Sequence, residues 1–172
     1  MRLYAVHIKT SDLPAFAVFD PGDTTGFAVL DFSGDLLAYG VAVDFFGEPD
    51  AKQLKMLLSR YTLQAMVIEK FRGRGGGSQK TQRRIEWLTW LAGQRKLVIV
   101  QQEPSQRMAF QADAHGKLPR DLEEIHRLRI HVVEAVAHGL AYLYRLNGKD
   151  AELAKARMAA QRRMMSVLRK AS

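Results

Sequence analysis

The strongest constraint in the sequence is a short apolar run that ends in an acid. Residues 16–19 are apolar without alternation, which is typical of a strand buried on both faces. Pro21 and Gly22 cannot continue this strand, so Asp20 is left at its carboxyl end. In an open α/β sheet, ligands and catalytic groups collect at that edge. Asp20 is therefore a candidate site residue, although Asp-Pro-Gly taken alone is equally compatible with a simple capped turn.

A second apolar run with the same ending lies at residues 65–69 and leads into Glu69. It follows a helical pattern at residues 48–60, and a strand after such a helix normally returns parallel to an earlier strand. Glu69 is therefore expected at the same sheet edge as Asp20. A single acid at a strand end is more often a solvated residue, but the coincidence of two favours a functional pair.

The remaining patterns predict strands and helices in a definite order. Three strands in succession form an antiparallel meander, at residues 15–20, 25–32 and 35–45. Helical spacing of apolar residues predicts helices at 48–60, 78–96 and 120–146. Two more strands are expected at 65–69 and 97–101, and an irregular connection at 111–119. The predicted fold class is thus α/β, a five-stranded mixed sheet of the meander plus two parallel strands, flanked by helices.

Length and composition favour a single domain, which we place at residues 15–147, with an extension at 1–14 and a basic helical tail at 148–172. Residues 3–8 are compatible with a short extra strand of no assigned role. The tail is either an amphipathic helix that binds DNA or a partner, or a partly ordered end. Cysteine is absent, which excludes disulfides, thiolate zinc sites and a cysteine nucleophile. Without a signal peptide or a membrane span, we expect a cytoplasmic protein, cellular or phage-encoded.

The formal net charge of +8 indicates a polyanionic partner. Residues 70–84 hold six basic residues, four glycines and no acid, so this loop is able to follow a phosphate backbone and grip it. A flexible linker is the alternative, but a linker does not need so one-sided a charge. Phe71 is either a core anchor or a ring offered to an unstacked base. The candidate DNA-binding residues are Phe71, Arg72, Arg74, Lys80, Arg83 and Arg84.

The helix at 120–146 carries His131, Glu134 and His138 at intervals of three and four, so these side chains project from one side of it. A helix packed back across the sheet would bring that side to Asp20 and Glu69. A lone helical histidine beside an apolar face is more often structural. Because Glu134 and two strand-end acids are expected nearby, a set of metal ligands is favoured instead.

Two further features bear on partners and on the site. The helix at 78–96 has an apolar surface broadened by Trp87 and Trp90, which suits either a protein interface or a helix sunk into its own core. After the strand at 97–101, the polar residues Ser105, Gln106 and Arg107 fall near the same sheet edge as Asp20.

Taken in order, these elements resemble the ribonuclease H-like fold, and more narrowly the RuvC family of Holliday-junction resolvases. The resemblance covers residues 17–146. Three motifs carry it, namely Asp20-Pro21-Gly22 with Thr25-Gly26-Phe27-Ala28-Val29, then Ile68-Glu69-Lys70-Phe71, and last His131-Val132-Val133-Glu134-Ala135.

The resemblance implies that Asp20, Glu69, His131 and Glu134 are the catalytic and metal-binding residues. The chain departs from the family at Glu134, where an aspartate is usual, and Phe71 falls where the family places an aromatic wedge. Carboxylates with one imidazole suit Mg²⁺ or Mn²⁺, and we expect two ions that activate water for attack on a phosphodiester. Asp20 is the expected bridge between the ions.

The implied substrate is branched DNA, a four-way junction. Because that junction has two-fold symmetry and needs two symmetric nicks, a homodimer is expected. Two other functions fit the same residues: another ribonuclease H-like nuclease, acting on flaps, branched DNA or RNA–DNA hybrids, or a non-catalytic protein that binds branched DNA. An actin-like phosphotransferase also begins with Asp-x-Gly, but it needs a second lobe for which this chain is too short.

Overall fold

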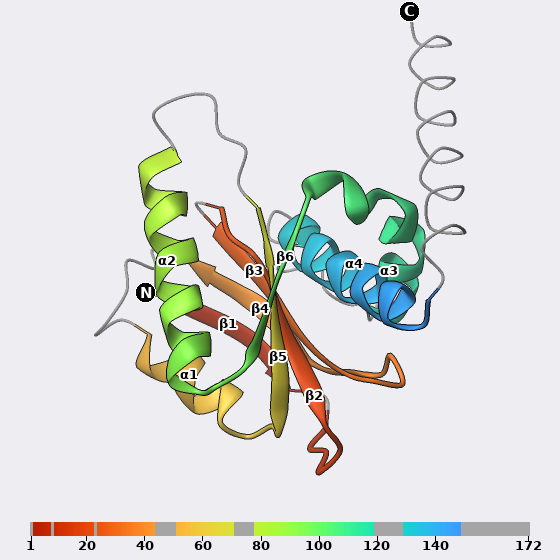
Figure 1. The fold of residues 1–172 in the computed structure, drawn as a ribbon, viewed down its shortest axis with the longest axis horizontal. Helices are drawn as coiled ribbons and strands as arrows, with labels where there is room; N and C mark the ends of the chain where they lie inside the picture. The colour runs from red at the N-terminus through yellow and green to blue at the C-terminus, as the bar shows by residue number, and fades with distance from the viewer. Residues whose placement is uncertain are drawn as a thin grey trace, which may run out of the picture.

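The buried strands form the centre of a six-stranded mixed sheet with helices on both faces (Figure 1). The computed structural model describes residues 2–7, 9–22, 24–43, 51–70, 78–118 and 129–148. The strands are β1 (Arg2–His7), β2 (Ala15–Asp20), β3 (Thr24–Asp31), β4 (Leu36–Val43), β5 (Leu63–Glu69) and β6 (Val98–Gln102). The helices are α1 (Lys52–Leu58), α2 (Ser78–Gln94), α3 (Gln111–Lys117) and α4 (Arg129–Leu146), with short 3₁₀ turns η1 (Pro104–Gln106) and η2 (Met108–Phe110).

The predicted α/β class is confirmed. The strand order is β1-β4-β3-β2-β5-β6, in which β2, β3 and β4 form the antiparallel meander. Strands β5 and β6 extend the sheet parallel to β2. Helices α1 and α2 lie on one face and α3 and α4 on the other (Figure 1). Among the described residues, no helix combines the length and the apolar character that a membrane crossing requires.

Two local predictions were wrong. The sheet has six strands rather than five, because β1 pairs antiparallel with β4 along its whole length, from Arg2 opposite Val43 to His7 opposite Ala38. The connection after β6 is helical rather than irregular. Phe110 of η2, Ala114 of α3 and Leu118, which directly follows α3, pack into the same core as the buried residues of α4. These three apolar residues recur every fourth position, which is the spacing of one helix face.

Helix α4 accounts for the carboxyl-terminal part of the predicted long helix. It is described from Arg129, and the predicted start at residues 120–128 lies outside the described residues. The helix ends at Leu146, and the expected glycine follows it: Gly148 adopts a φ of +72° and donates its backbone N–H to the carbonyl of Arg145. The predicted tail beyond residue 148 also lies outside the described residues.

Strand β2 is buried on both faces, as its unbroken apolar run predicts. Phe16 and Val18 belong to the core under α3 and α4, whereas Ala17 and Phe19 belong to the core under α1 and α2. Side chains alternate along a strand, so Asp20 projects to the same face as Phe16 and Val18. The α4 face of the sheet therefore carries an acid at the carboxyl end of its central strand.

The hairpin between β3 and β4 is closed by Asp31. Its Oδ1 accepts hydrogen bonds from the Ser33 backbone N–H at 3.0 Å, the Ser33 hydroxyl at 2.5 Å and the Asp35 backbone N–H at 2.9 Å. Burial raises the pKa of the Asp31 carboxyl, but the hydrogen bonds from Ser33 and Asp35 outweigh it and leave the pKa below its ordinary value.

We predict that Asp31→Asn lowers the free energy of unfolding by about 1 kcal/mol at pH 7, because neutral hydrogen bonds replace charge-assisted ones. A depressed folded pKa stabilises the protein above the unfolded pKa, and this stabilisation is lost as pH falls through the folded pKa. The difference between variant and wild type should therefore shrink in acid, as measured by urea unfolding.

The matched control is Asp35→Asn, whose carboxylate makes an exposed ion pair with Lys9. It should change stability much less, because exposed ion pairs contribute little. An Asp31→Asn difference that is the same at pH 7 and in acid would contradict the assigned role of the carboxylate.

Candidate active site

The two predicted strand-end acids lie at one edge of the sheet. Strands β2 and β5 are parallel neighbours in which Phe19 is opposite Ile68, so Asp20 and Glu69 both follow directly at the carboxyl ends. Ala65 and Val67 belong to the core under α4, and the alternation along β5 places Glu69 on that same face. Both carboxylates thus face the helix that carries His131 and Glu134.

A glycine allows α4 to reach this edge. Gly26 of β3 is paired with Asp20 across the antiparallel ladder. A Cβ at position 26 would lie 2.0 Å from the carbonyl oxygen of His131 and 2.4 Å from its carbonyl carbon. No real side chain tolerates such distances, so the first turn of α4 rests directly on the β3 backbone. This contact brings the His131 side of α4 over Asp20.

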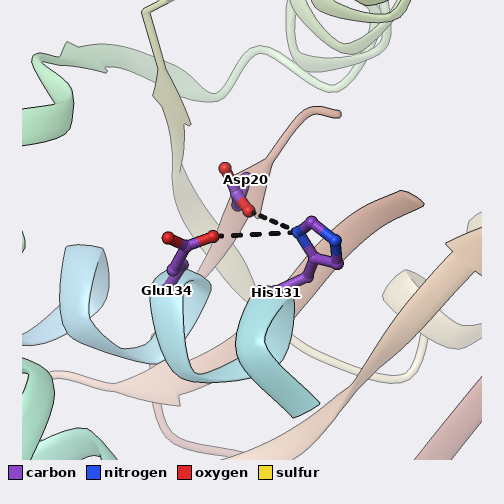
Figure 2. Close-up of side chains that lie close together, drawn as sticks. All are labelled: Asp20, His131 and Glu134. Carbon is purple, nitrogen blue, oxygen red and sulfur yellow. Dashed lines mark hydrogen bonds and ion pairs between the residues drawn. The ribbon is translucent and has the colours of Figure 1, made fainter. Parts of the chain in front are cut away.

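Asp20, His131 and Glu134 meet at this point (Figure 2). Each offers one ligand atom, and these atoms all lie within 4.8 Å of one another. His131 Nδ1 is 3.2 Å from Asp20 Oδ2 and 3.7 Å from Glu134 Oε2. The strand end and one face of the helix therefore supply two carboxylates and an imidazole to a single point.

The electrostatics of the three groups suit a cation. The hydrogen bond to Asp20 raises the pKa of His131 above its ordinary value, against a lowering by burial. Burial, and next the nearby Asp20 carboxyl, raise the pKa of Glu134. Two acids held together in a half-buried site repel each other, and a positive charge between them relieves that repulsion. Oxygen donors with one imidazole are a donor set that Mg²⁺ and Mn²⁺ accept, so the residues fit the expected ion.

Glu69 is connected to this cluster through an arginine. Arg107, which lies between η1 and η2, donates from Nη1 to Glu69 Oε2 at 2.6 Å and from Nη2 to Glu134 Oε1. Burial lowers the pKa of Arg107, but Glu69, Glu134 and Asp20 outweigh it and raise the pKa. The structure thus brings three of the four predicted ligands together, and it sets Glu69 across the Arg107 guanidinium from Glu134.

Arg107, His138 and Gln102 also contact the site. The sequence placed Arg107 near this sheet edge and His138 on the ligand-bearing side of the helix without giving either a specific contact, and it did not single out Gln102. The position of Arg107 after β6 was the one available signal for that residue. His138 shares the helix face of His131 and Glu134, and its Nε2 lies 2.5 Å from Glu69 Oε2. Gln102 ends β6 and lies 2.7 Å from His138 Nδ1. Nothing in its own sequence context distinguishes Gln102 from any strand-end amide.

The predicted DNA-binding residues separate into three groups. Lys80 and Arg83 are exposed on α2, which begins at the sheet end where β5 finishes (Figure 1). Arg84 is only 3% exposed and donates from Nη1 to the carbonyl of Gly22, so it supports the turn after Asp20 instead of standing free on the surface as a phosphate ligand would. Phe71, Arg72 and Arg74 lie outside the described residues.

We predict that Gly26→Ala separates α4 from β3 and disperses the cluster. The variant should unfold at a lower temperature, because the added methyl overlaps backbone atoms of His131 that cannot move without the whole helix. The loss should be on the order of 1–3 kcal/mol, measured by thermal or urea unfolding.

Gly93→Ala is the matched control. Gly93 lies in α2, and a Cβ there meets nothing within 4 Å, so alanine should leave stability unchanged or raise it by up to about 1 kcal/mol. Equal stability of the two variants would contradict the close approach of α4 to β3.

Comparison with known proteins gives the fold a context. No family model matches the sequence, and no curated protein matches it. Thermus thermophilus RuvC in complex with a Holliday junction substrate superimposes with a TM-score of 0.59 at 19% identity, covering 78% of this chain and 96% of that one. Thermus thermophilus RuvC alone gives a TM-score of 0.52 at 19% identity, covering 78% and 97%.

A viral structure gives the same result. The fowlpox virus resolvase in complex with Holliday junction DNA superimposes with a TM-score of 0.54 at 12% identity, covering 77% of this chain and 98% of that one. The expected resemblance is therefore confirmed at the level of the fold: this chain has the ribonuclease H-like fold of RuvC and of the fowlpox virus Holliday junction resolvase.

Proposed function

We propose that this protein is a structure-specific DNA endonuclease that resolves four-way junctions by divalent-metal-dependent hydrolysis of phosphodiester bonds. The observation that carries the proposal is the cluster of Asp20, His131 and Glu134 at the carboxyl edge of the sheet. Support comes from the fold, which is that of two proteins solved with Holliday junctions. The positive net charge of the chain is consistent with a DNA substrate.

In this proposal Asp20, His131 and Glu134 hold Mg²⁺ or Mn²⁺, and Glu69 holds the second of the two expected ions. When bound, such ions activate water and stabilise charge on the leaving 3′ oxygen. His131 must release a proton from Nδ1 to become a ligand, and Asp20 raises the pKa for that release. Metal binding is therefore in competition with protons and is favoured as pH rises.

Arg107 has a separate role in the proposal. Its guanidinium holds the Glu69 and Glu134 carboxylates at a fixed separation, because Nη1 pairs with Glu69 and Nη2 pairs with Glu134. It also supplies fixed positive charge beside the place where a DNA phosphate would bind. A half-buried cation of this kind reduces the repulsion between the acids and the phosphate, whatever ion is bound.

Cleavage of a junction by two symmetric nicks requires two active sites, and we propose a homodimer. The helix that bears the tryptophans is our candidate for part of the interface. Trp90 is 46% exposed on α2, and the Lys55 ammonium lies 5.2 Å from its ring centre, whereas Trp87 packs against the core. One tryptophan is therefore part of the chain's own core, and the other is exposed and available to a protein interface.

We predict that Asp20→Asn retains junction binding and loses cleavage. The amide keeps the shape of the carboxylate but not its charge, so the variant should cut a synthetic four-way junction at least about 100-fold more slowly in Mg²⁺ or Mn²⁺. Binding is measured by gel shift without divalent metal, and cleavage is measured on the same labelled junction.

Asp35→Asn is the matched control, because it makes the same chemical change on the exposed hairpin. It should cut like the wild type. An Asp20→Asn protein that cuts at the wild-type rate would remove the proposed mechanism. Wild-type protein that binds the junction but cuts neither it nor a flap, duplex or RNA–DNA hybrid with any divalent ion would instead favour a binding protein.

We predict that Lys80→Gln and Arg83→Gln weaken junction binding evenly across sequences. Each removes one cation that would release a counterion from DNA, so the slope of log affinity against log salt should fall by roughly 1 per residue. Gel shifts over a salt series measure this slope. Lys52→Gln, on α1 toward the opposite end of the sheet, should leave it unchanged (Figure 1). Equal slopes for all three variants would contradict a DNA path along the start of α2.

A further inference from the structure

His138 is a fully buried histidine one turn beyond Glu134 on α4. Its relative exposure is 0%, although it lies in a helix that otherwise packs small and apolar residues against the sheet. An imidazole in such a place is costly unless both ring nitrogens have hydrogen-bond partners. The partners of His138 therefore indicate what it does.

Both nitrogens of His138 have partners, and these come from two neighbouring strands. Nε2 lies 2.5 Å from Glu69 Oε2, at the end of β5. Nδ1 lies 2.7 Å from the side-chain amide of Gln102, at the end of β6. Glu69 and Gln102 are opposite each other in the parallel ladder, so His138 spans a single rung of the sheet.

The orientation of the Gln102 amide determines where the imidazole proton resides. With its nitrogen toward the ring, the amide donates to His138 Nδ1 at 2.7 Å and to the His138 carbonyl at 3.1 Å, and its oxygen accepts from the Tyr142 backbone N–H at 3.3 Å. In the opposite orientation the amide oxygen faces acceptors and its nitrogen faces donors. The first orientation makes Nδ1 an acceptor, so the proton of the neutral ring is on Nε2 and is donated to Glu69.

This arrangement distinguishes the two oxygens of Glu69. Oε2 accepts from both His138 Nε2 and Arg107 Nη1, the latter at 2.6 Å. Oε1 receives no hydrogen bond from the part of the chain that the structure describes. The two donors therefore fix the rotation of the carboxylate and leave Oε1 as the oxygen with capacity for a cation.

We propose that His138, oriented by Gln102, is a positioning residue that presents Glu69 Oε1 to the second of the two expected divalent ions. This inference rests on the proposed function, because it requires a bound ion. Hydrogen-bonded groups behind metal ligands commonly change metal affinity by about 10- to 100-fold when they are removed. His138 does not itself contact the ion or the DNA in this arrangement.

The test compares two variants of His138 in the full-length protein. His138→Leu removes the donor to Glu69, whereas His138→Gln can retain an N–H at a similar reach. Mn²⁺ binding is measured by electron paramagnetic resonance and calorimetry without DNA, so activity is not the readout. We expect the leucine variant to bind Mn²⁺ about 10-fold or more weakly, and the glutamine variant to recover most of that loss.

A second measurement is made on the wild type and does not depend on a variant that folds. Long-range ¹H–¹⁵N spectra of the imidazoles report which nitrogen of His138 carries a proton. We expect a proton on Nε2 alone, and Gln102→Leu should abolish this preference. A ring that carries its proton at Nδ1 alone has no donor for Glu69 Oε2, and this result would overturn the proposal.

The outcomes separate this inference from the proposed function. If wild-type protein binds Mn²⁺ and Asp20→Asn weakens that binding, while a folded His138→Leu variant binds like the wild type, the positioning role fails and the nuclease proposal stands. If wild-type protein binds no Mn²⁺ and cuts no junction, the proposed function fails, and the positioning role fails with it.

Discussion

The close approach of α4 to β3 at Gly26 is the contact on which the site depends. Helices usually rest on a sheet through side chains, but here the His131 backbone occupies the space that a Cβ would need. Because Gly26 is the ladder partner of Asp20, the helix touches the sheet beside the acid that ends the central strand. This contact between backbones sets how closely His131 and Glu134 lie over the sheet.

This packing brings negatively charged carboxylates close together, and nearby positive groups must offset their repulsion. Asp20 and Glu134 are brought close in a partly buried place, and burial together with their proximity raises the pKa of Glu134. Arg107 supplies positive charge to Glu134 and Glu69, and His131 supplies it to Asp20 when its ring is protonated. Fixed cations stabilise the acids, but they do not neutralise all of them at once. The negative charge that remains uncompensated is what makes the cluster suited to a divalent ion.

Sequence patterns predicted those parts of the molecule that depend on local periodicity. Unbroken apolar runs marked β2 and β5, so the positions of Asp20 and Glu69 at one edge followed from the parallel crossover. The place of β1 could not be predicted, because its pairing with β4 joins residues between 31 apart (His7 and Ala38) and 41 apart (Arg2 and Val43). The sequence of a short strand does not indicate which strand it pairs with. The contacts of Arg107 and Gln102 were missed for a similar reason, since a polar side chain acquires its role from neighbours that only the fold supplies.

The resemblance to the RuvC family implies an aspartate at the position of Glu134, and the surrounding contacts explain how a glutamate fits there. Glutamate extends one methylene further than aspartate, and here its two oxygens serve different partners. Oε2 faces His131 Nδ1 at 3.7 Å, whereas Oε1 accepts from Arg107. The extra length therefore allows Glu134 to remain beside Asp20 and His131 and also to bond Arg107, which holds Glu69. A shorter acid at this position would reach one of these partners only if α4 or Arg107 moved, so Glu134 and Arg107 are best regarded as a matched pair.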